Sequence, residues 1–186
     1  MDKKEIIQEA AAFLFSSKGY HATTIRDIAK YANVNVAMIT YYFTSKENLL
    51  LEIIHNLSVA VEMIDKDMEK SCNYPEKKLY DFIHNTLDIS KKLRNVCKLV
   101  LQLQMLDAGR DINKTIRKIK EKHYTTFLAV IQGTDPEEKW FGRNIYLYNS
   151  FMVLLWEDLT SETFDTKDNH LADISVLLYN YLNTML

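Results

Sequence analysis

The chain has 186 residues, of which 47% are hydrophobic, and its formal net charge is −2. This length allows one large domain or a small module joined to a larger one, and the near-neutral charge gives no global signal for nucleic acid or an acidic membrane. Only four glycines and two prolines occur. Since these residues mark the turns of sheet-rich folds, their scarcity favours an all-helical protein with short connections.

Residues 2–18 predict an amphipathic helix, because apolar side chains recur there at i, i+3 and i+4 and Gly19 follows as a helix stop. Thr24, followed three residues later by Asp27, has the pattern of a capping box. It predicts a short helix that ends near Asn33, a residue type that tolerates left-handed backbone.

Asn35 can cap a second short helix that runs to about residue 43. Two short helices separated by a turn of about three to four residues are typical of a helix-turn-helix. Ile39 and Phe43 are four residues apart, so we expect both to face the core of this module. A long helix is then predicted over residues 45–70.

Helical patterning continues through the rest of the chain. The expected helices cover residues 76–93, 95–107, 111–132, 136–160 and 168–186. Residues 99–106 alternate like a strand, but a single strand has no partner, so a helix is preferred. No apolar run approaches the ~20 residues of a membrane span, and the N-terminus lacks the pattern of a signal peptide. We therefore expect a cytoplasmic protein that does not enter a membrane.

The stretch IIQEAAAFLFSSKGYHATTIRDIAKYANVNVAMITYYFTSKENL, residues 6–49, combines several motifs in a specific order. An A-A-x-x-L-F helix is followed by the KGY stop, TTIRDIA, a turn, a short helix that ends in aromatic residues, and SKENL. In order and spacing it resembles the DNA-binding domain of TetR-type (TetR/AcrR) bacterial transcriptional regulators.

The resemblance implies an all-α fold of about nine helices. An N-terminal three-helix DNA-binding module, residues 1–46, would be joined by a continuous helix to a ligand-binding and dimerisation domain, residues 47–186. The chain departs from the family pattern at several positions of the turn and the second short helix. The family usually has Gly where this chain has Asn33, and other residues where it has Asn35, Val36, Ala37 and Thr40. These positions bear on the operator sequence.

The second short helix would enter the major groove of double-stranded DNA. The candidate DNA-contacting residues are Thr24, Arg26, Asn35, Val36, Ala37, Met38, Thr40, Tyr41, Tyr42 and Lys46. Between residues 35 and 42 there is no Arg or Lys to bind guanine, whereas apolar side chains can contact thymine methyl groups. We therefore expect an A·T-rich operator, with phosphate contacts from Tyr41, Thr40 and Lys46.

Charge is distributed unevenly along the chain. Residues 1–50 hold six basic and five acidic residues, for a net charge of about +1, which is weak for a DNA-binding module. Residues 108–124 hold six basic and two acidic residues, whereas residues 134–173 hold three basic and nine acidic ones. Such runs usually form solvated faces. The basic run would add an attractive field for DNA if it lay on the DNA side.

The resemblance also implies an effector pocket between helices of the second domain, a common place for sites in helical bundles. The candidate pocket residues are Met63, Phe82, Thr86, Leu99, Gln102, Leu103, Tyr124, Phe127 and Tyr148. Most are large and apolar, which favours a largely apolar effector. Each also has an ordinary interpretation, as core packing for the apolar residues and as a solvated or hydrogen-bonded group for the polar ones.

The last two predicted helices are apolar over more than one face, which favours a second burial surface against another subunit. The candidate dimer-interface residues are Phe151, Leu155, Trp156, Ile174, Leu178 and Tyr181. A two-fold axis would place two reading helices on successive major grooves, roughly 34–36 Å apart.

The function expected from these observations is a sequence-specific transcriptional repressor that a small, largely apolar effector releases from its operator. The alternative is a helix-turn-helix protein controlled by a protein partner, or an activator without an effector. An enzyme is not expected, because the five histidines are scattered and no metal-binding, phosphate-binding or nucleophile motif occurs. No cofactor and no metal ion are expected.

Overall fold

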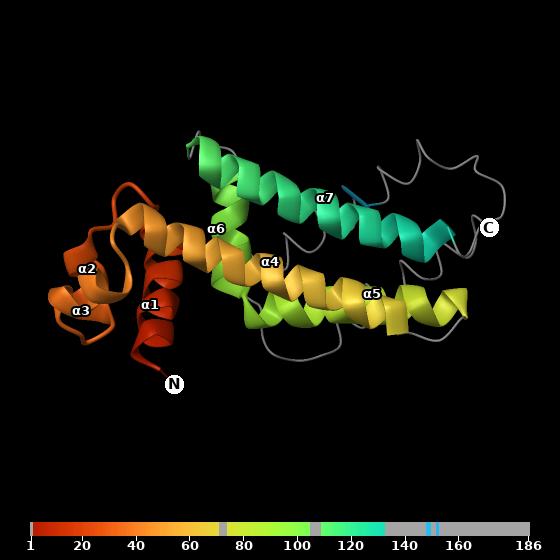
Figure 1. Cartoon of the computed structure of the whole chain (residues 1–186), viewed down its shortest axis with the longest axis horizontal. Helices are drawn as coiled ribbons and strands as arrows, with labels where there is room; N and C mark the ends of the chain where they lie inside the picture. Colours follow the sequence, from red (N-terminus) through yellow and green to blue (C-terminus); the bar gives the residue numbers. More distant parts are fainter. Residues whose placement is uncertain (1, 71–73, 105–108, 133–147, 150–151, 153–186) are drawn as a thin grey trace. The chain divides into compact units, whose positions relative to one another are not determined.

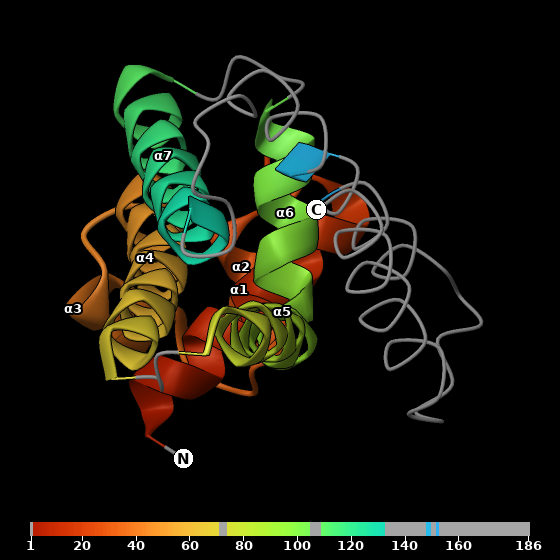
Figure 2. The same cartoon turned by 90° about the vertical axis from the view of Figure 1, so that its right-hand side faces the viewer.

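The computed structural model describes residues 2–70, 74–104, 109–132, 148–149 and 152. Figure 1 and Figure 2 show the helices of these ranges from two directions. They are α1 (Lys3–Lys18), α2 (Ile25–Tyr31), α3 (Val36–Tyr42), α4 (Lys46–Lys70), α5 (Pro75–Lys92), α6 (Arg94–Gln104) and α7 (Arg110–Gln132). None of the described residues forms a strand, so the all-α class is confirmed. No helix within the described ranges is both long and apolar enough to cross a membrane.

The helix boundaries differ from the predicted ones by a few residues at most. The alternating stretch after residue 98 is helical through Gln104, as preferred over a strand. Of the helix predicted over residues 136–160, only residues 148, 149 and 152 are described. The helix predicted over residues 168–186 lies outside the described residues.

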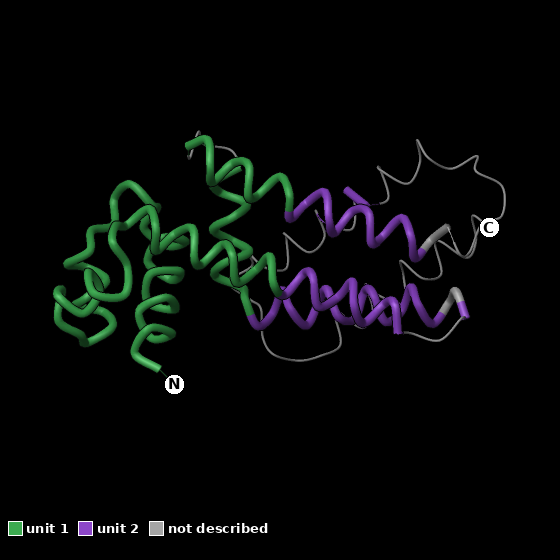
Figure 3. The backbone as a smooth tube through the Cα atoms, in the orientation of Figure 1, with its two compact units in different colours: residues 1–59, 93–118 green, residues 60–92, 119–186 purple. Residues whose placement is uncertain are grey.

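The chain divides into two compact units (Figure 3). Unit 1 comprises residues 1–59 and 93–118, and unit 2 comprises residues 60–92 and 119–186. Since α4 and α7 both cross these limits, each helix contributes one part to each unit. The functional boundary expected after residue 46 stays a prediction.

Unit 1 is built on α1, against which α2, α3 and α6 pack. Its largest fully buried side chains are Ile7, Phe15, Ile28, Ile39, Leu49, Leu50, Ile53, Ile54, Leu99 and Leu103. The helices α2 and α3 have seven residues each. Isolated helices of fewer than ~12 residues are marginal in water, so packing of Ile28 and Ile39 into this core holds them in place.

Local signals in the sequence set the turns of unit 1, as predicted. Gly19 ends α1 with φ of 91°, and its N–H donates to the Phe15 carbonyl. Thr24 and Asp27 form a capping box at the start of α2. Asn33 is left-handed with φ of 51°, and the Asn35 side chain accepts a hydrogen bond from the N–H of Ala37.

Asn33→Val is expected to lower the free energy of unfolding by about 1–2 kcal/mol, because a β-branched residue is strained at positive φ. Asn33→Gly should preserve or raise it, since glycine adopts this conformation without strain. Urea unfolding of both variants measures the difference. Asn95→Val, at an exposed position of α6, gives the effect of valine in a helix alone. An equal loss at positions 33 and 95 would contradict the assigned backbone strain.

Unit 2 has its own apolar core. The buried residues are Ile64, Met68, Leu79, Phe82, Ile83, Leu87, Phe127, Val130 and Tyr148. They come from the second part of α4, from α5, from the second part of α7 and from the short described segment that contains Tyr148. Residues distant in the sequence therefore meet in one cluster.

Candidate functional site

The outer face of α3 is an uncharged surface. Tyr41 is 84% exposed and Val36 is 39% exposed. Ala37 and Thr40 are also exposed, whereas Met38 is half-buried. Apolar and hydroxyl-bearing side chains therefore form the accessible part of the predicted reading helix. The half-buried Tyr42 packs edge-on against Tyr41, with 5.2 Å between the ring centroids.

The inner face of α3 is anchored to the rest of unit 1. Ile39 and Phe43 are only 1% and 2% exposed, as their spacing predicts. The Lys4 ammonium lies 5.6 Å from the centroid of the Phe43 ring. Lys4 also forms an ion pair with Glu52 of α4, at 2.6 Å. These contacts fix the helix from one side and leave its outer face for a partner.

The two short polar side chains of this surface already make local hydrogen bonds. The Asn35 Oδ1 atom accepts from the Ala37 N–H at 2.9 Å. The Thr40 hydroxyl donates to the Val36 carbonyl at 3.2 Å. The Asn35 side chain therefore keeps its amide N–H donors available for a further hydrogen bond, and the Thr40 oxygen remains available as an acceptor.

Thr24 and Arg26, at the start of α2, are both exposed. The Thr24 hydroxyl donates to the Asp27 carboxylate at 2.8 Å and accepts from the Asp27 N–H at 3.1 Å. Hydrogen bonds from the Thr24 backbone and side chain hold the pKa of Asp27 below its ordinary value. To donate to a phosphate, the Thr24 hydroxyl would have to leave this carboxylate.

Lys46 has a structural role that the sequence did not indicate. Its ammonium donates to the carbonyl groups of Tyr20 and Thr23, at 2.9 Å and 3.1 Å. It also lies 4.3 Å from the centroid of the Tyr20 ring. Lys46 thus joins the start of α4 to the connection between α1 and α2. Its expected phosphate contact stays a prediction.

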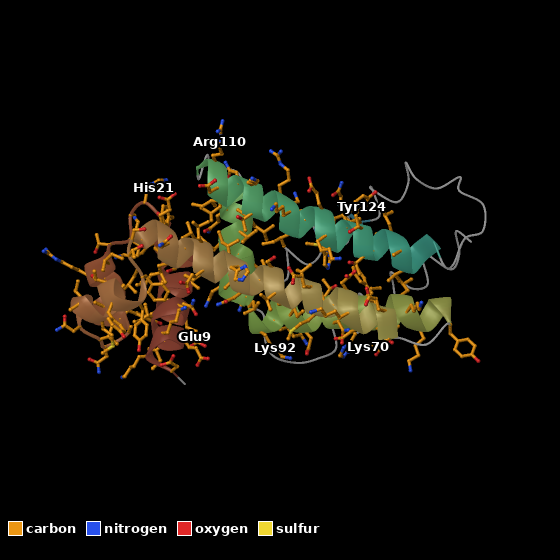
Figure 4. The ribbon with its side chains drawn as sticks, viewed as in Figure 1. Glu9, His21, Lys70, Lys92, Arg110 and Tyr124 are labelled. Atoms are coloured by element: carbon orange, nitrogen blue, oxygen red, sulfur yellow. The ribbon has the colours of Figure 1, made fainter. Side chains whose placement is uncertain are left out.

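The first part of the basic run, up to Lys118, belongs to unit 1, the unit that contains α3, whereas Lys120 and Lys122 belong to unit 2. Arg110, Lys114, Arg117 and Lys118 are all exposed. Figure 4 shows Arg110 extending away from the helix at its first residue. Since exposed charges act over about a Debye length of ~8–10 Å, this run contributes to the electrostatic field of unit 1 and not to its core.

Four of the predicted pocket residues, Phe82, Thr86, Phe127 and Tyr148, are buried in unit 2. The Phe82 and Phe127 ring centroids are 5.7 Å apart, and those of Phe127 and Tyr148 are 5.6 Å apart. Tyr124 meets Tyr148 edge-on at 5.0 Å. The Thr86 hydroxyl donates to the Phe82 carbonyl at 2.8 Å. The structure therefore brings these five candidates together, and we call the four aromatic residues with Thr86 the aromatic cluster.

A buried histidine completes this aromatic cluster. His123, on α7, is 5% exposed. Its Nε2 atom lies 3.1 Å from the Thr86 hydroxyl, and its Nδ1 atom lies 3.0 Å from the Tyr148 hydroxyl. Burial lowers the pKa of His123 to about 4, so the imidazole is neutral at physiological pH. We call this set the Tyr148–His123–Thr86 network.

The remaining pocket candidates lie elsewhere. Met63 is 59% exposed, which is incompatible with the lining of an enclosed pocket. Leu99 and Leu103 are buried on α6 in unit 1. Gln102 lies on the same helix, and its amide donates to the Ser16 carbonyl at 3.0 Å. That carbonyl belongs to the last turn of α1, where helix ends leave carbonyl groups without helical partners. Gln102 thus serves the packing of α6 on α1.

The predicted dimer-interface residues Phe151, Leu155, Trp156, Ile174, Leu178 and Tyr181 lie outside the described residues. Their role in dimerisation stays a prediction.

His123 was absent from the candidates drawn from the sequence, although a signal for it exists. Along α7 the buried positions Ile112, Ile116 and Ile119 recur at spacings of three and four, and the next step falls on His123. A histidine on the apolar stripe of a helix is expected to be buried. Its two hydrogen-bond partners come from distant segments and could not be predicted in this way.

Comparison with known proteins places this geometry in context. Residues 7–53 match the sequence profile of bacterial regulatory proteins of the tetR family. The probable HTH-type transcriptional regulator YttP of Bacillus subtilis is 32% identical over 141 residues, which cover 73% of this chain and 66% of that protein. IcaR of Staphylococcus epidermidis, an HTH-type negative transcriptional regulator of the biofilm operon icaADBC, is 26% identical over 136 residues, which cover 72% of this chain and 70% of that protein.

Among solved structures, the crystal structure of the transcriptional regulator FadR from Bacillus subtilis in complex with stearoyl-CoA aligns over 96% of both chains. Its TM-score is 0.68 and its sequence identity is 20%. At this identity the likeness concerns the fold alone. The chain spans about two thirds of the length of YttP, the relative with the higher identity of the two named above.

Proposed function

Because the chain belongs to the tetR family of bacterial regulatory proteins, which are DNA-binding transcriptional regulators and not enzymes, we propose that it represses transcription by binding operator DNA through α3. The observation that carries this proposal is the surface of α3. Its inner residues are fixed in the core of unit 1, and its outer residues, Tyr41 above all, remain exposed. The relative IcaR is a negative regulator, which supports repression over activation.

The chemistry of this surface supports an A·T-rich operator. The apolar side chains of Val36 and Ala37 can contact thymine methyl groups, and the Asn35 amide N–H can donate to a base acceptor such as adenine N7. Since α3 contains no Arg or Lys, the bidentate contact that usually selects guanine is missing. Phosphate contacts from Arg26, Tyr41 and Lys46 would add affinity without sequence information.

Selection of operators from a randomised DNA pool with the purified full chain should yield half-sites with thymine-rich cores. The chain should also bind the DNA upstream of its own gene in a gel shift, with an affinity that falls steeply with salt. Enrichment of half-sites with G·C cores would contradict the A·T preference alone. Absence of any sequence-specific binding at moderate salt would contradict the proposed function itself.

We propose further that a small, largely apolar effector binds at the aromatic cluster of unit 2 and releases the operator. Phe82, Thr86, Tyr124, Phe127 and Tyr148 support this location, because aromatic walls with a few polar groups are typical of small-molecule sites. FadR, whose fold is similar, was crystallised with stearoyl-CoA. Operator binding that no small molecule changes would favour control by a protein partner instead.

A homodimer is part of the same proposal. One α3 reads only a half-site, and two copies related by a two-fold axis would read half-sites about 34–36 Å apart. Light scattering of the free protein and of its operator complex measures this stoichiometry. A single copy bound to the selected operator would contradict the dimer and leave DNA binding by α3 intact.

A further inference from the structure

The polar side chains inside the aromatic cluster need an explanation beyond packing. Thr86, His123 and Tyr148 are 4%, 5% and 4% exposed, and they lie among apolar and aromatic residues of unit 2. Burying a polar group is unfavourable unless it is hydrogen-bonded, and apolar residues of similar shape would fill the same space without that requirement. Such a network therefore suggests a role in recognition.

The proton positions in the Tyr148–His123–Thr86 network can be assigned from its hydrogen bonds. The Thr86 hydroxyl donates its one proton to the Phe82 carbonyl at 2.8 Å, so its oxygen can only accept from His123. Neutral His123 therefore carries its proton on Nε2 and accepts at Nδ1. The Tyr148 hydroxyl must then donate to Nδ1 across 3.0 Å. The three hydrogen bonds of the network therefore all donate in one direction, from Tyr148 through His123 and Thr86 to the Phe82 carbonyl.

The direction of these hydrogen bonds determines which ligand groups the Tyr148 hydroxyl can bind. With its proton given to His123, the Tyr148 oxygen can only accept a further hydrogen bond. A ligand group that meets it must carry an N–H or O–H. The residues of the aromatic cluster are uncharged. Lys122, which precedes His123 in the sequence, is already paired with Asp65 at 2.6 Å. A charged ligand group would therefore lose its hydration without gaining a counter-ion.

The rings around Tyr148 favour an aromatic body for the ligand. Tyr148 is in ring contact with His123 at 5.7 Å, Tyr124 at 5.0 Å and Phe127 at 5.6 Å between centroids. Aromatic pairs at such distances prefer edge-on and tilted arrangements, which a further flat ring can join. On the basis of the proposed effector site, we infer that the effector is an uncharged aromatic molecule whose N–H or O–H group donates to the Tyr148 hydroxyl oxygen.

A matched set of probes tests this inference. 2-Naphthol carries an uncharged donor, 2-methoxynaphthalene has the same rings without a donor, and 2-naphthoate is an anion at neutral pH. Binding to the full chain is measured by calorimetry at pH 7, below the titration of naphthol. We expect 2-naphthol to bind about 10-fold more tightly than 2-methoxynaphthalene, and 2-naphthoate to bind most weakly. Equal affinities for the first two probes, or preference for the anion, would overturn the inference.

Two variants separate recognition from a structural role. Tyr148→Phe removes the acceptor and should abolish the preference for 2-naphthol over 2-methoxynaphthalene. Tyr80→Phe, at a tyrosine of α5 that is 49% exposed, is the control and should keep it. If Tyr148 were only structural, its variant would lower the melting temperature and leave the ranking of the probes unchanged.

Thr86→Val provides an independent test if Tyr148→Phe folds poorly. Without the Thr86 oxygen, the His123 proton is no longer held on Nε2 and can move to Nδ1, where it donates to Tyr148. The Tyr148 hydroxyl is then able to donate to a ligand, so 2-methoxynaphthalene should bind at least as well as 2-naphthol. Nitrogen-15 chemical shifts of His123 report the tautomer directly. An Nδ1–H tautomer in the wild-type chain would overturn the inference, whereas operator binding by the free chain tests the proposed function separately.

Discussion

Val36→Glu is expected to weaken operator binding at least about 100-fold while the protein stays folded. Val36 lies in the first turn of α3 and is 39% exposed. A carboxylate there would face phosphates and base acceptors of the major groove, and such like-charge contacts raise the free energy of a complex by several kcal/mol. An acidic residue in the first turn of a helix is itself favourable, so α3 should remain intact. Fluorescence anisotropy with the selected operator measures the affinity.

The chain offers a closely matched control for this substitution. Val59, on α4 in unit 1, is also a valine and is also 39% exposed. Val59→Glu introduces the same charge into the same unit at a site away from α3, and it should leave operator affinity within about two-fold. If both variants lost binding equally, the effect would come from net charge, and α3 would no longer be supported as the reading helix.

Acidification from pH 6.5 to pH 4 is expected to lower the free energy of unfolding by about 3 kcal/mol through His123 alone. Burial lowers the pKa of this imidazole from 6.5 to about 4. Below pH 6.5 the unfolded chain takes up a proton that the folded chain does not bind. Stability is therefore fully present above pH 6.5 and is lost as the pH falls towards 4. Urea unfolding at a series of pH values measures the slope.

His123→Gln should remove this slope between pH 6.5 and 4, because glutamine can still hydrogen-bond Thr86 but does not titrate. His84→Gln, at an exposed histidine of α5, should retain it. Hydrogen bonds from Lys122 and Lys92 hold the pKa values of the Asp65 and Asp88 carboxyl groups below their ordinary value, so these groups add to the slope only below about pH 5, and they do so equally in both histidine variants. A slope unchanged in His123→Gln would contradict the neutral buried imidazole.

The helix-turn-helix could be predicted closely because its signals are local. Gly19, the Thr24 and Asp27 pair, Asn33 and Asn35 each determine the backbone within a few residues of their own position. The spacing of Ile39 and Phe43 was enough to assign the inner face of α3. What an outer face then contacts depends on DNA, so the operator preference remains a hypothesis.

The effector site was only partly predictable because it depends on which helices meet. The sequence places Phe82, Thr86 and Phe127 on predicted helices. Nothing in their spacing shows that Tyr148 packs against them. For the same reason Gln102 was assigned to the pocket. Its partner, the Ser16 carbonyl, is 86 residues away in the sequence. Long-range hydrogen bonds of this kind cannot be predicted from the spacing of residue types along the sequence.

The chain passes from unit 1 to unit 2 and back, and this path limits which segments can be exchanged with a related protein. Unit 1 draws on residues 1–59 and again on residues 93–118, and α6 of the second segment packs against α1 of the first. A single cut after α4 would remove Leu99, Leu103 and Gln102 from that contact and expose the apolar side of α1. A chimaera that takes its operator specificity from a relative must therefore receive α6 of that relative together with the first 59 residues.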